Sequence, residues 1–243
     1  MTQIDSEKKL DRLKLSKLLK TIYKDHTNEE INCICNQLLQ ILDNFSEKSR
    51  YEEKSFDRKW DESYSVLITY ADGVYKKGEA TLVTLRDLLS KHFGSLSKVI
   101  HILLFLKSTS DGGFAVSSHK SLEEKFGNWE DLNSISKKHY VMADLVLNHV
   151  SSSHPWVQQF IKCQEPSLSN VFSPSQDLDW NNVIRPRSSS LFSQISTDNG
   201  VKQVWTTFGP DQIDLNWLNP KMTIEFLNLI TVSYTHLTLP TKA

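Results

Sequence analysis

The sequence is poor in cysteine, in net charge and in long apolar runs, and each shortage excludes a class of protein. Its three cysteines, Cys33, Cys35 and Cys163, are too few and too unevenly spaced for a disulfide framework or a zinc site. A formal net charge of -1 gives no basic surface for nucleic acid or anionic lipid. The longest largely apolar run, 99–106, is too short to span a membrane, and the N-terminus lacks a signal-peptide core. We therefore expect a cytoplasmic protein with no nucleic-acid or membrane partner.

The first part of the chain has the apolar period of helices. Residues 8–45 carry two apolar stripes, and Thr27 followed by Glu30 between them has the pattern of a capping box. No residue there has a spacing that chemistry would need, which favours a packing or interaction appendage. With the charged stretch 47–61, this predicts a helical N-terminal extension and linker over residues 1–59.

From residue 64 onward, strand and helix patterns alternate. Strands are predicted at 66–70, 99–105 and 140–148, and helices at 81–93 and 128–138. Three such units in series imply a parallel sheet with right-handed crossovers. Their lengths suit either a doubly wound sheet or a (β/α)8 barrel, and spacing alone does not choose between the two.

The third predicted strand ends in polar groups. Asp144 lies inside an apolar run and needs a partner if it is buried. Asn148 and His149 follow at the C-terminal end, where α/β barrels and open sheets place their chemistry. The alternative is a core aspartate followed by a capping pair.

After this strand the regular pattern stops. Residues 151–208 are rich in Ser, Asn, Asp and Pro and are too long for a simple connection, which predicts an inserted subdomain and a possible lid. Within it, Arg185-Pro186-Arg187 places two guanidinium groups on a stiff turn suited to phosphate or carboxylate. A solvated surface turn is the alternative, and the commoner one for an isolated Arg-Pro-Arg.

Several segments occurring in order resemble one family. Together they resemble the sucrose phosphorylase branch of the α-amylase superfamily, glycoside hydrolase family 13, which includes glucosylglycerate phosphorylases. The resemblance covers roughly residues 60–230. The segments are 67–70, 99–103, 111–114, 126–131, 144–149, 185–187 and 208–216.

The resemblance implies an α/β fold. It is the N-terminal part of a (β/α)8 TIM barrel, with a B-domain insertion after the third strand and a helical hairpin extension before the barrel. Residues 60–150 would form the first three β/α units, 151–208 a B-domain-like insertion, and 209–230 the return to the barrel through its third helix. The final segment, 231–243, lacks the family's pattern and looks like a non-native adapter-derived tail, so we exclude it from fold reasoning.

The resemblance also implies an activity: phosphorolysis of a glucosyl bond to glucose 1-phosphate by a retaining mechanism. The partners would be a glucosyl disaccharide or glucosyl glycerate and inorganic phosphate, without a metal or organic cofactor. An oxocarbenium-like transition state needs carboxylates around the anomeric carbon and neutral groups that fix the sugar hydroxyls. The alternatives are a family 13 hydrolase or glucosyltransferase, and a noncatalytic helical interaction protein with a degenerate sugar site.

The resemblance assigns roles to residues that match its motifs. His149 matches a glucose-binding histidine, and Asp144 and Asn148 match supporting positions in the same motif. Phe208 matches an apolar wall and Gln212 a polar contact near the glucose. Arg185 and Arg187 are the phosphate-binding candidates.

The chain also departs from the family's pattern. Ser118-His119 stands where the family usually has an aspartate before a tyrosine or histidine, so a neutral hydroxyl replaces a carboxylate that would hold a glucose hydroxyl. The family's three catalytic carboxylates lie on later strands, beyond the last residue given. We therefore predict no catalytic residue in this chain, and expect it to be inactive alone.

Overall fold

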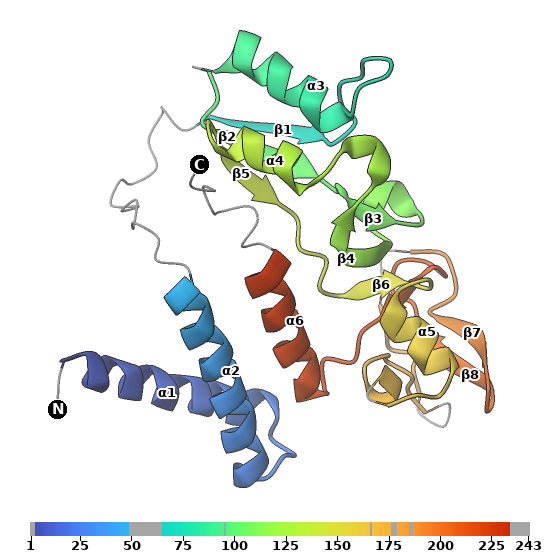
Figure 1. Cartoon of the computed structure of the whole chain (residues 1–243). Helices are drawn as coiled ribbons and strands as arrows, with labels where there is room; N and C mark the ends of the chain where they lie inside the picture. The colour runs from blue at the N-terminus through green and yellow to red at the C-terminus, as the bar shows by residue number, and fades with distance from the viewer. Residues whose placement is uncertain are drawn as a thin grey trace.

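A computed structural model describes residues 3–48, 65–94, 96–165, 167–175, 179–184 and 187–233 (Figure 1). Arg185, one of the two phosphate-binding candidates, lies outside the described residues, as does Pro186. So do most of the predicted linker 47–61 and most of the predicted tail 231–243.

A three-stranded parallel sheet with the order β1-β2-β5 forms the upper part of the molecule in Figure 1. β1 and β2 are each followed by a crossover that contains a helix, so the sheet has the topology of successive β/α units. The elements are β1 (Val66–Tyr70), α3 (Thr81–Leu88), β2 (Val99–Leu103), α4 (Trp129–Ser136) and β5 (Tyr140–Ala143). The predicted parallel sheet is confirmed.

Two of the strands end earlier than the sequence predicts. Leu104 adopts a left-handed backbone with φ 50°, which a strand does not allow, so β2 stops at Leu103. The third strand stops at Ala143, and the chain then leaves the sheet for the short strand β6 (His149–Ser151). The predicted strand over 140–148 is therefore wrong in its second half.

One face of the sheet is covered and the other is open. Leu67, Ile100 and Val141 share one face through the strand register and pack against the helix residues Leu82 and Leu132. The neighbouring row on the other face is Ile68, His101 and Met142, where Ile68 is 61% exposed and Met142 43% exposed. An open apolar face is unusual, because parallel sheets are normally covered on both sides.

Helix ends in this region follow local chemistry. α3 continues as a single π-helical turn, η1 (Leu89–Phe93), and ends at Gly94, as the sequence predicts. Asn128 caps α4 by accepting hydrogen bonds from the backbone of Glu130 and Asp131, and Asp131 closes the capping box by accepting from the Asn128 backbone.

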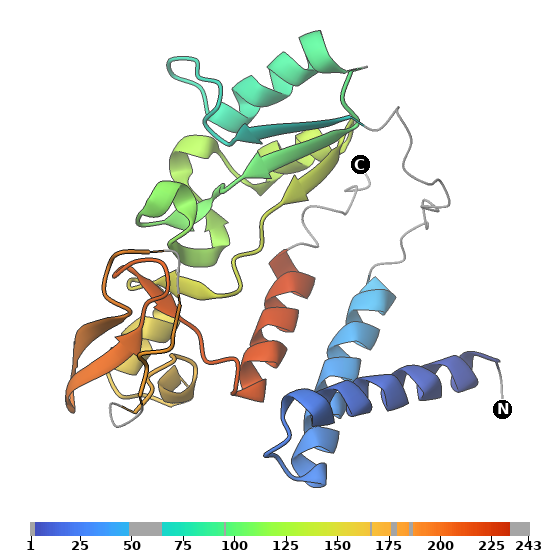
Figure 2. The ribbon, with the colours of Figure 1, turned by 180° about the vertical axis from the view of Figure 1, so that it is seen from behind.

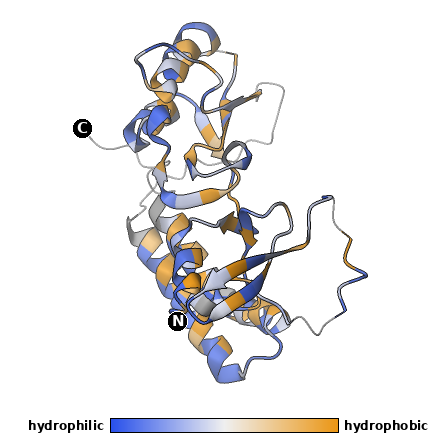
Figure 3. Ribbon diagram, turned by 90° about the vertical axis from the view of Figure 1, so that its right-hand side faces the viewer, coloured by the Kyte–Doolittle hydropathy of each residue, from blue (hydrophilic) through white to orange (hydrophobic). Residues whose placement is uncertain are grey.

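A helical pair precedes the sheet and packs against the last helix, α6 (Pro220–Ser233) (Figures 1 and 2). It consists of α1 (Gln3–Ile22) and α2 (Asn28–Lys48), and the capping box between them forms, since the Thr27 and Glu30 backbones each donate to the other side chain. Tyr23 Oη lies 2.7 Å from Thr223 Oγ1 on α6. Helices in Figure 3 carry both orange and blue segments, as expected when one stripe of an amphipathic helix is buried.

A small antiparallel pair of strands connects the sheet to the remaining part. It contains β3 (Leu106–Ser108) and β4 (Val116–Leu122), joined through the 3-10 turn η2 (Asp111–Gly113) and followed by the 3-10 turn η3 (Glu124–Phe126).

The segment after β5 forms a second compact region. β6 pairs antiparallel with β9 (Gln212–Asp214), and the chain between them forms a helix, a 3-10 turn and a hairpin. These are α5 (Pro155–Ile161), η4 (Ser167–Ser169), β7 (Phe192–Thr197) and β8 (Gly200–Trp205). Val150, Phe160 and Ile213 form its core with Met222 and Phe226 of α6, so this region and the helical pair share α6.

Among the described residues, no helix is long and apolar enough to cross a membrane.

Candidate functional site

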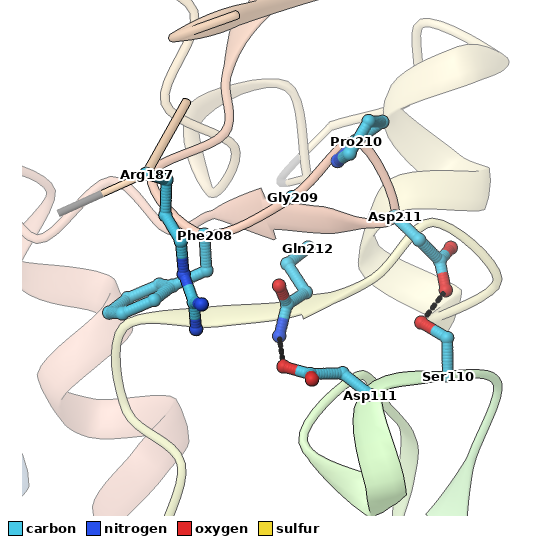
Figure 4. Close-up of a pocket in the computed structure, with 8 residues that line it drawn as sticks. All are labelled: Ser110, Asp111, Arg187, Phe208, Gly209, Pro210, Asp211 and Gln212. Carbon is cyan, nitrogen blue, oxygen red and sulfur yellow. Dashed lines mark hydrogen bonds between the residues drawn. The ribbon is translucent and has the colours of Figure 1, made fainter. Parts of the chain in front are cut away.

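A cavity of about 310 Å³ lies between the η2 turn and the connection from β8 to β9 (Figure 4). Two of its walls come from chain segments that are far apart in sequence. Its lining residues are Ser110, Asp111, Arg187, Phe208, Gly209, Pro210, Asp211 and Gln212.

His149 stands behind this cavity. Its side chain is 5% exposed, its ring centroid lies 5.1 Å from that of Phe208, and its Nε2 lies 3.2 Å from Gln212 Nε2. Burial lowers the pKa of His149 below 6.5, against a smaller opposing effect from Asp214. The structure therefore brings together His149, Phe208 and Gln212, three of the residues predicted from the resemblance.

Asn148 precedes His149 in the chain, and its side chain contacts Asp214. Its Nδ2 donates to Asp214 Oδ2 at 3.1 Å, and Asp214 also accepts from the backbone and hydroxyl of Thr207. Burial raises the pKa of Asp214 despite these donors. Asp214 thus ties the His149 strand to the return strand at a position that the sequence did not single out.

Arg187 supplies the described positive charge of the cavity. Its guanidinium carbon lies 5.9 Å from the Phe208 ring centroid, which is a cation–π arrangement (Figure 4). In this position the guanidinium group faces the same space as the Gln212 amide.

Two carboxylates line the cavity, and the sequence reasoning missed both as site residues. Asp111 accepts from Gln212 Nε2 at 2.8 Å. Asp211 is partly buried, which raises its pKa, but hydrogen bonds from Ser152, Thr109 and Ser110 outweigh this effect and lower it overall. Both lie in segments that carry the resemblance, 111–114 and 208–216, so these segments contained a signal for them.

Asp144 lies apart from the cavity, beyond the end of β5. Its Oδ1 lies 3.2 Å from His101 Nε2, on the side of the sheet that carries the open face. It is absent from the described lining of the cavity.

Ser118 and His119 lie on β4 and are also absent from the described lining. Ser118 Oγ contacts Ser121 Oγ at 3.4 Å and accepts from the Lys120 backbone at 3.3 Å. His119 is buried, with its Nδ1 3.4 Å from His154 Nε2. Burial lowers the pKa of His119 to about 4 and that of His154 to about 3.

Within the part of the chain that the structure describes, no group of three or more His, Cys, Asp or Glu side chains could hold a metal ion.

The comparisons with known proteins first define the class of protein. The model of the family described as "Alpha amylase, catalytic domain" matches residues 97–236, more than half of the chain. The chain therefore belongs to the α-amylase family.

The relatives identify the branch within that family. A glucosylglycerate phosphorylase of Allomeiothermus silvanus is 40% identical over 174 residues, which are 70% of this chain and 31% of that enzyme. A sucrose phosphorylase of Bifidobacterium adolescentis is 30% identical over 161 residues, which are 62% of this chain and 31% of that enzyme. These relatives confirm the resemblance to the phosphorylase branch. The chain spans about a third of their length.

A solved structure agrees with the fold. The sucrose 6F-phosphate phosphorylase from Thermoanaerobacter thermosaccharolyticum superposes with a TM-score of 0.66 at 25% identity, over 77% of this chain and 40% of that one. The three-stranded parallel sheet is thus part of an α-amylase-type α/β barrel fold.

Proposed function

We propose that this chain is part of a phosphorylase that transfers a glucosyl group to inorganic phosphate with retention of configuration. The substrate would be sucrose-like or glucosylglycerate-like, and the product glucose 1-phosphate. One observation carries the proposal: Phe208, Gln212 and Arg187 line a single cavity, and the buried ring of His149 contacts both Phe208 and Gln212. The names of the curated relatives support the same reaction class.

In this proposal the sugar lies against the Phe208 ring, with His149 and Gln212 beside it. An aromatic face and neutral polar groups suit a neutral, hydroxyl-rich ring, because they bind it without an uncompensated buried charge. Asn148 supports His149 through Asp214. We propose that Asp144 supports the same motif from the sheet side through its contact with His101.

Arg187 would meet phosphate. Its guanidinium group rests on Phe208 at the open side of the cavity, where a bidentate contact to an oxyanion is possible once the loop moves. We keep Arg185 as the second candidate, from the resemblance alone.

Ser118 and His119 remain candidates for the sugar by resemblance. Their contacts on β4 favour a supporting role for His119, whose buried ring joins β4 to the first helix after His149. Ser118 would reach a sugar only after the segment around it rearranges.

We propose that the described carboxylates of the cavity are not catalytic. Asp111 and Asp211 both accept hydrogen bonds from neighbouring side chains, so neither is placed as a free nucleophile. The chain alone would then bind sugar without turning it over. We also propose that residues 151–208 act as a B-domain-like lid on a cytoplasmic enzyme, and residues 1–59 as an appendage.

A chimera tests the proposal. Residues 65–230 replace the matching segment of the Allomeiothermus silvanus enzyme, and product formation from glucosylglycerate and from sucrose is followed with and without phosphate. We expect glucose 1-phosphate that depends on phosphate. Release of free glucose at the same rate in both conditions would favour a hydrolase of the same family, and a folded chimera with no turnover would favour the noncatalytic reading.

A further inference from the structure

The hydrogen bonds around the cavity point to a positioning residue that the family resemblance did not assign. We infer that Asp111 fixes the direction of the Gln212 amide and, through it, the position of the proton on His149. The three side chains come from η2, β9 and β6, and two contacts connect them. Gln212 Nε2 lies 2.8 Å from Asp111 Oδ2 (Figure 4) and 3.2 Å from His149 Nε2.

The Asp111 carboxylate determines the orientation of the Gln212 side-chain amide. An ionised carboxylate only accepts hydrogen bonds, so the amide nitrogen of Gln212, not its oxygen, must face Asp111. The same nitrogen is the atom nearest to His149. Gln212 has two N–H groups on that nitrogen, so it donates one to each neighbour.

The orientation of the Gln212 amide in turn determines the tautomer of His149. Since Nε2 accepts from Gln212, the proton of the neutral ring must lie on Nδ1. Nδ1 is buried and has no hydrogen-bond partner of ordinary geometry among the described residues, while the ring also interacts with the backbone of Phe114. Burial favours the neutral ring, which this arrangement requires.

The turn that carries Asp111 is built at a conformational cost. Asp111, Gly112 and Gly113 follow one another with φ values of 55°, 60° and 110°. A side chain at Gly113 would meet Leu104, because an ideal Cβ there lies 2.5 Å from the Leu104 Cβ. A non-glycine residue kept in the left-handed region is uncommon, and such positions occur often at functional sites, where surrounding contacts hold them. Here the strained turn aims a carboxylate at Gln212.

These two hydrogen bonds of Gln212 determine which hydrogen-bonding group its side chain offers to a ligand in the cavity. Gln212 Oε1 accepts no hydrogen bond from a described residue, so with its nitrogen committed to Asp111 and His149 the amide offers an acceptor to the cavity. A ligand hydroxyl would bind here as a donor. This consequence rests on the proposed function, in which the ligand is a glucosyl group. The hydrogen-bond arrangement of Asp111, Gln212 and His149 does not depend on that function.

Nitrogen-15 NMR of the chain labelled at its histidines tests this hydrogen-bond arrangement without any ligand, because it reports which ring nitrogen of His149 carries the proton. His149 is assigned by its loss in His149→Gln. We expect a neutral His149 with its proton on Nδ1 in the wild type. Asp111→Asn should give a mixture of the two tautomers, because an asparagine can donate as well as accept and no longer fixes the amide. Asp72→Asn, which removes an exposed carboxylate paired with Lys125, is the matched control and should leave the wild-type pattern.

Gln212→Glu is a second variant in case Asp111→Asn does not fold. It replaces the donor beside Nε2 by an acceptor, so the proton should move to Nε2. A wild-type His149 with its proton on Nε2, or an unchanged tautomer in a folded Asp111→Asn or Gln212→Glu variant, overturns the inference.

Glucose added to the same samples tests the proposed function separately. Asp111→Asn should weaken glucose binding about fivefold, the value of one neutral hydrogen bond. If glucose leaves the nitrogen-15 signals of His149 unchanged in a wild type that has the expected tautomer, the proposed function fails. The orientation of Gln212 by Asp111 then still stands.

Discussion

His149 faces Asp214 across the antiparallel pair of β6 and β9, so the strand that begins the second compact region is bonded to the strand that ends it. This pairing puts Gln212 next to His149 and brings Asn148 within reach of Asp214. The candidate site therefore depends on closure of the whole segment between the two strands. It cannot form from the 144–149 motif alone.

The open face of the sheet predicts self-association. Ile68 and Met142 are exposed in one row with His101, and such a surface is favoured to bury itself against another copy. Sedimentation velocity should show mass increasing with protein concentration, and Ile68→Lys should reduce this. Ile184→Lys is the matched control, because it changes a side chain that is 96% exposed and lies outside the sheet, and it should not reduce the association. A wild type that stays monomeric over the whole range would contradict the prediction.

Gly113 should tolerate a side chain much less than its neighbour. Gly113→Ala adds a left-handed backbone cost and a clash with the Leu104 Cβ, so we expect a loss of about 2 to 4 kcal/mol in the free energy of unfolding. Gly112→Ala also has a positive φ but meets nothing within 4 Å, and should cost only about 1 kcal/mol. Urea unfolding of the two variants makes the comparison, and equal losses would show that Leu104 can move aside.

The buried pair His119 and His154 predicts a loss of stability in acid. Their folded pKa values, about 4 and about 3, lie below the ordinary 6.5, so the unfolded chain binds more protons as the pH falls. Stability should be full above pH 6.5 and should fall between 6.5 and 4, with each residue contributing up to about 1.4 kcal/mol per pH unit.

His154→Asn isolates this effect. Its side-chain oxygen can still accept from the Trp156 backbone as the N-cap of α5, while one titrating ring is removed. The dependence of stability on pH should become less steep, while buried His119 and His149 still contribute. A slope equal to that of the wild type would assign the acid sensitivity to other groups.

Arg187 should matter for phosphate more than for sugar. In the chimera, Arg187→Ala should raise the KM for phosphate about tenfold to hundredfold, the value of a charge-assisted contact, and leave hydrolysis nearly unchanged. Lys202→Ala removes the same charge from β8, where the lysine lies over the Phe160 ring, and serves as the control. A parallel loss of phosphorolysis and hydrolysis would make Arg187 a structural residue.

Much of the fold could be predicted because it follows from local patterns. The strand at 66–70, the capping box at Thr27 and the cap at Asn128 are each decided by residues close in sequence. The end of β5 could not be predicted, because the apolar run continues to residue 150. The chain leaves the sheet after Ala143 and next pairs with β9 through β6, a contact made far along the chain.

Some residues of the candidate site could also be predicted from the sequence, and others could not. His149, Phe208 and Gln212 could be predicted from motif resemblance, although only the fold brings them to one cavity. Asp111 and Asp214 could not, since their importance lies in hydrogen bonds to Gln212 and Asn148. Ser118 and Asp144 matched motif positions as well, yet their contacts in the structure lie elsewhere.

We propose that the cavity beside His149 binds the glucosyl group during transfer to phosphate. The test measures kcat/KM for phosphate-dependent formation of glucose 1-phosphate by the chimera, with His149→Ala and with His92→Ala, whose histidine lies on η1 and is absent from the described lining of the cavity. We predict a loss of at least about tenfold for His149→Ala, from a lost polar contact and lost packing on Phe208, and no change for His92→Ala. An active chimera in which both variants retain the full rate would show that the cavity beside His149 does not bind the glucosyl group.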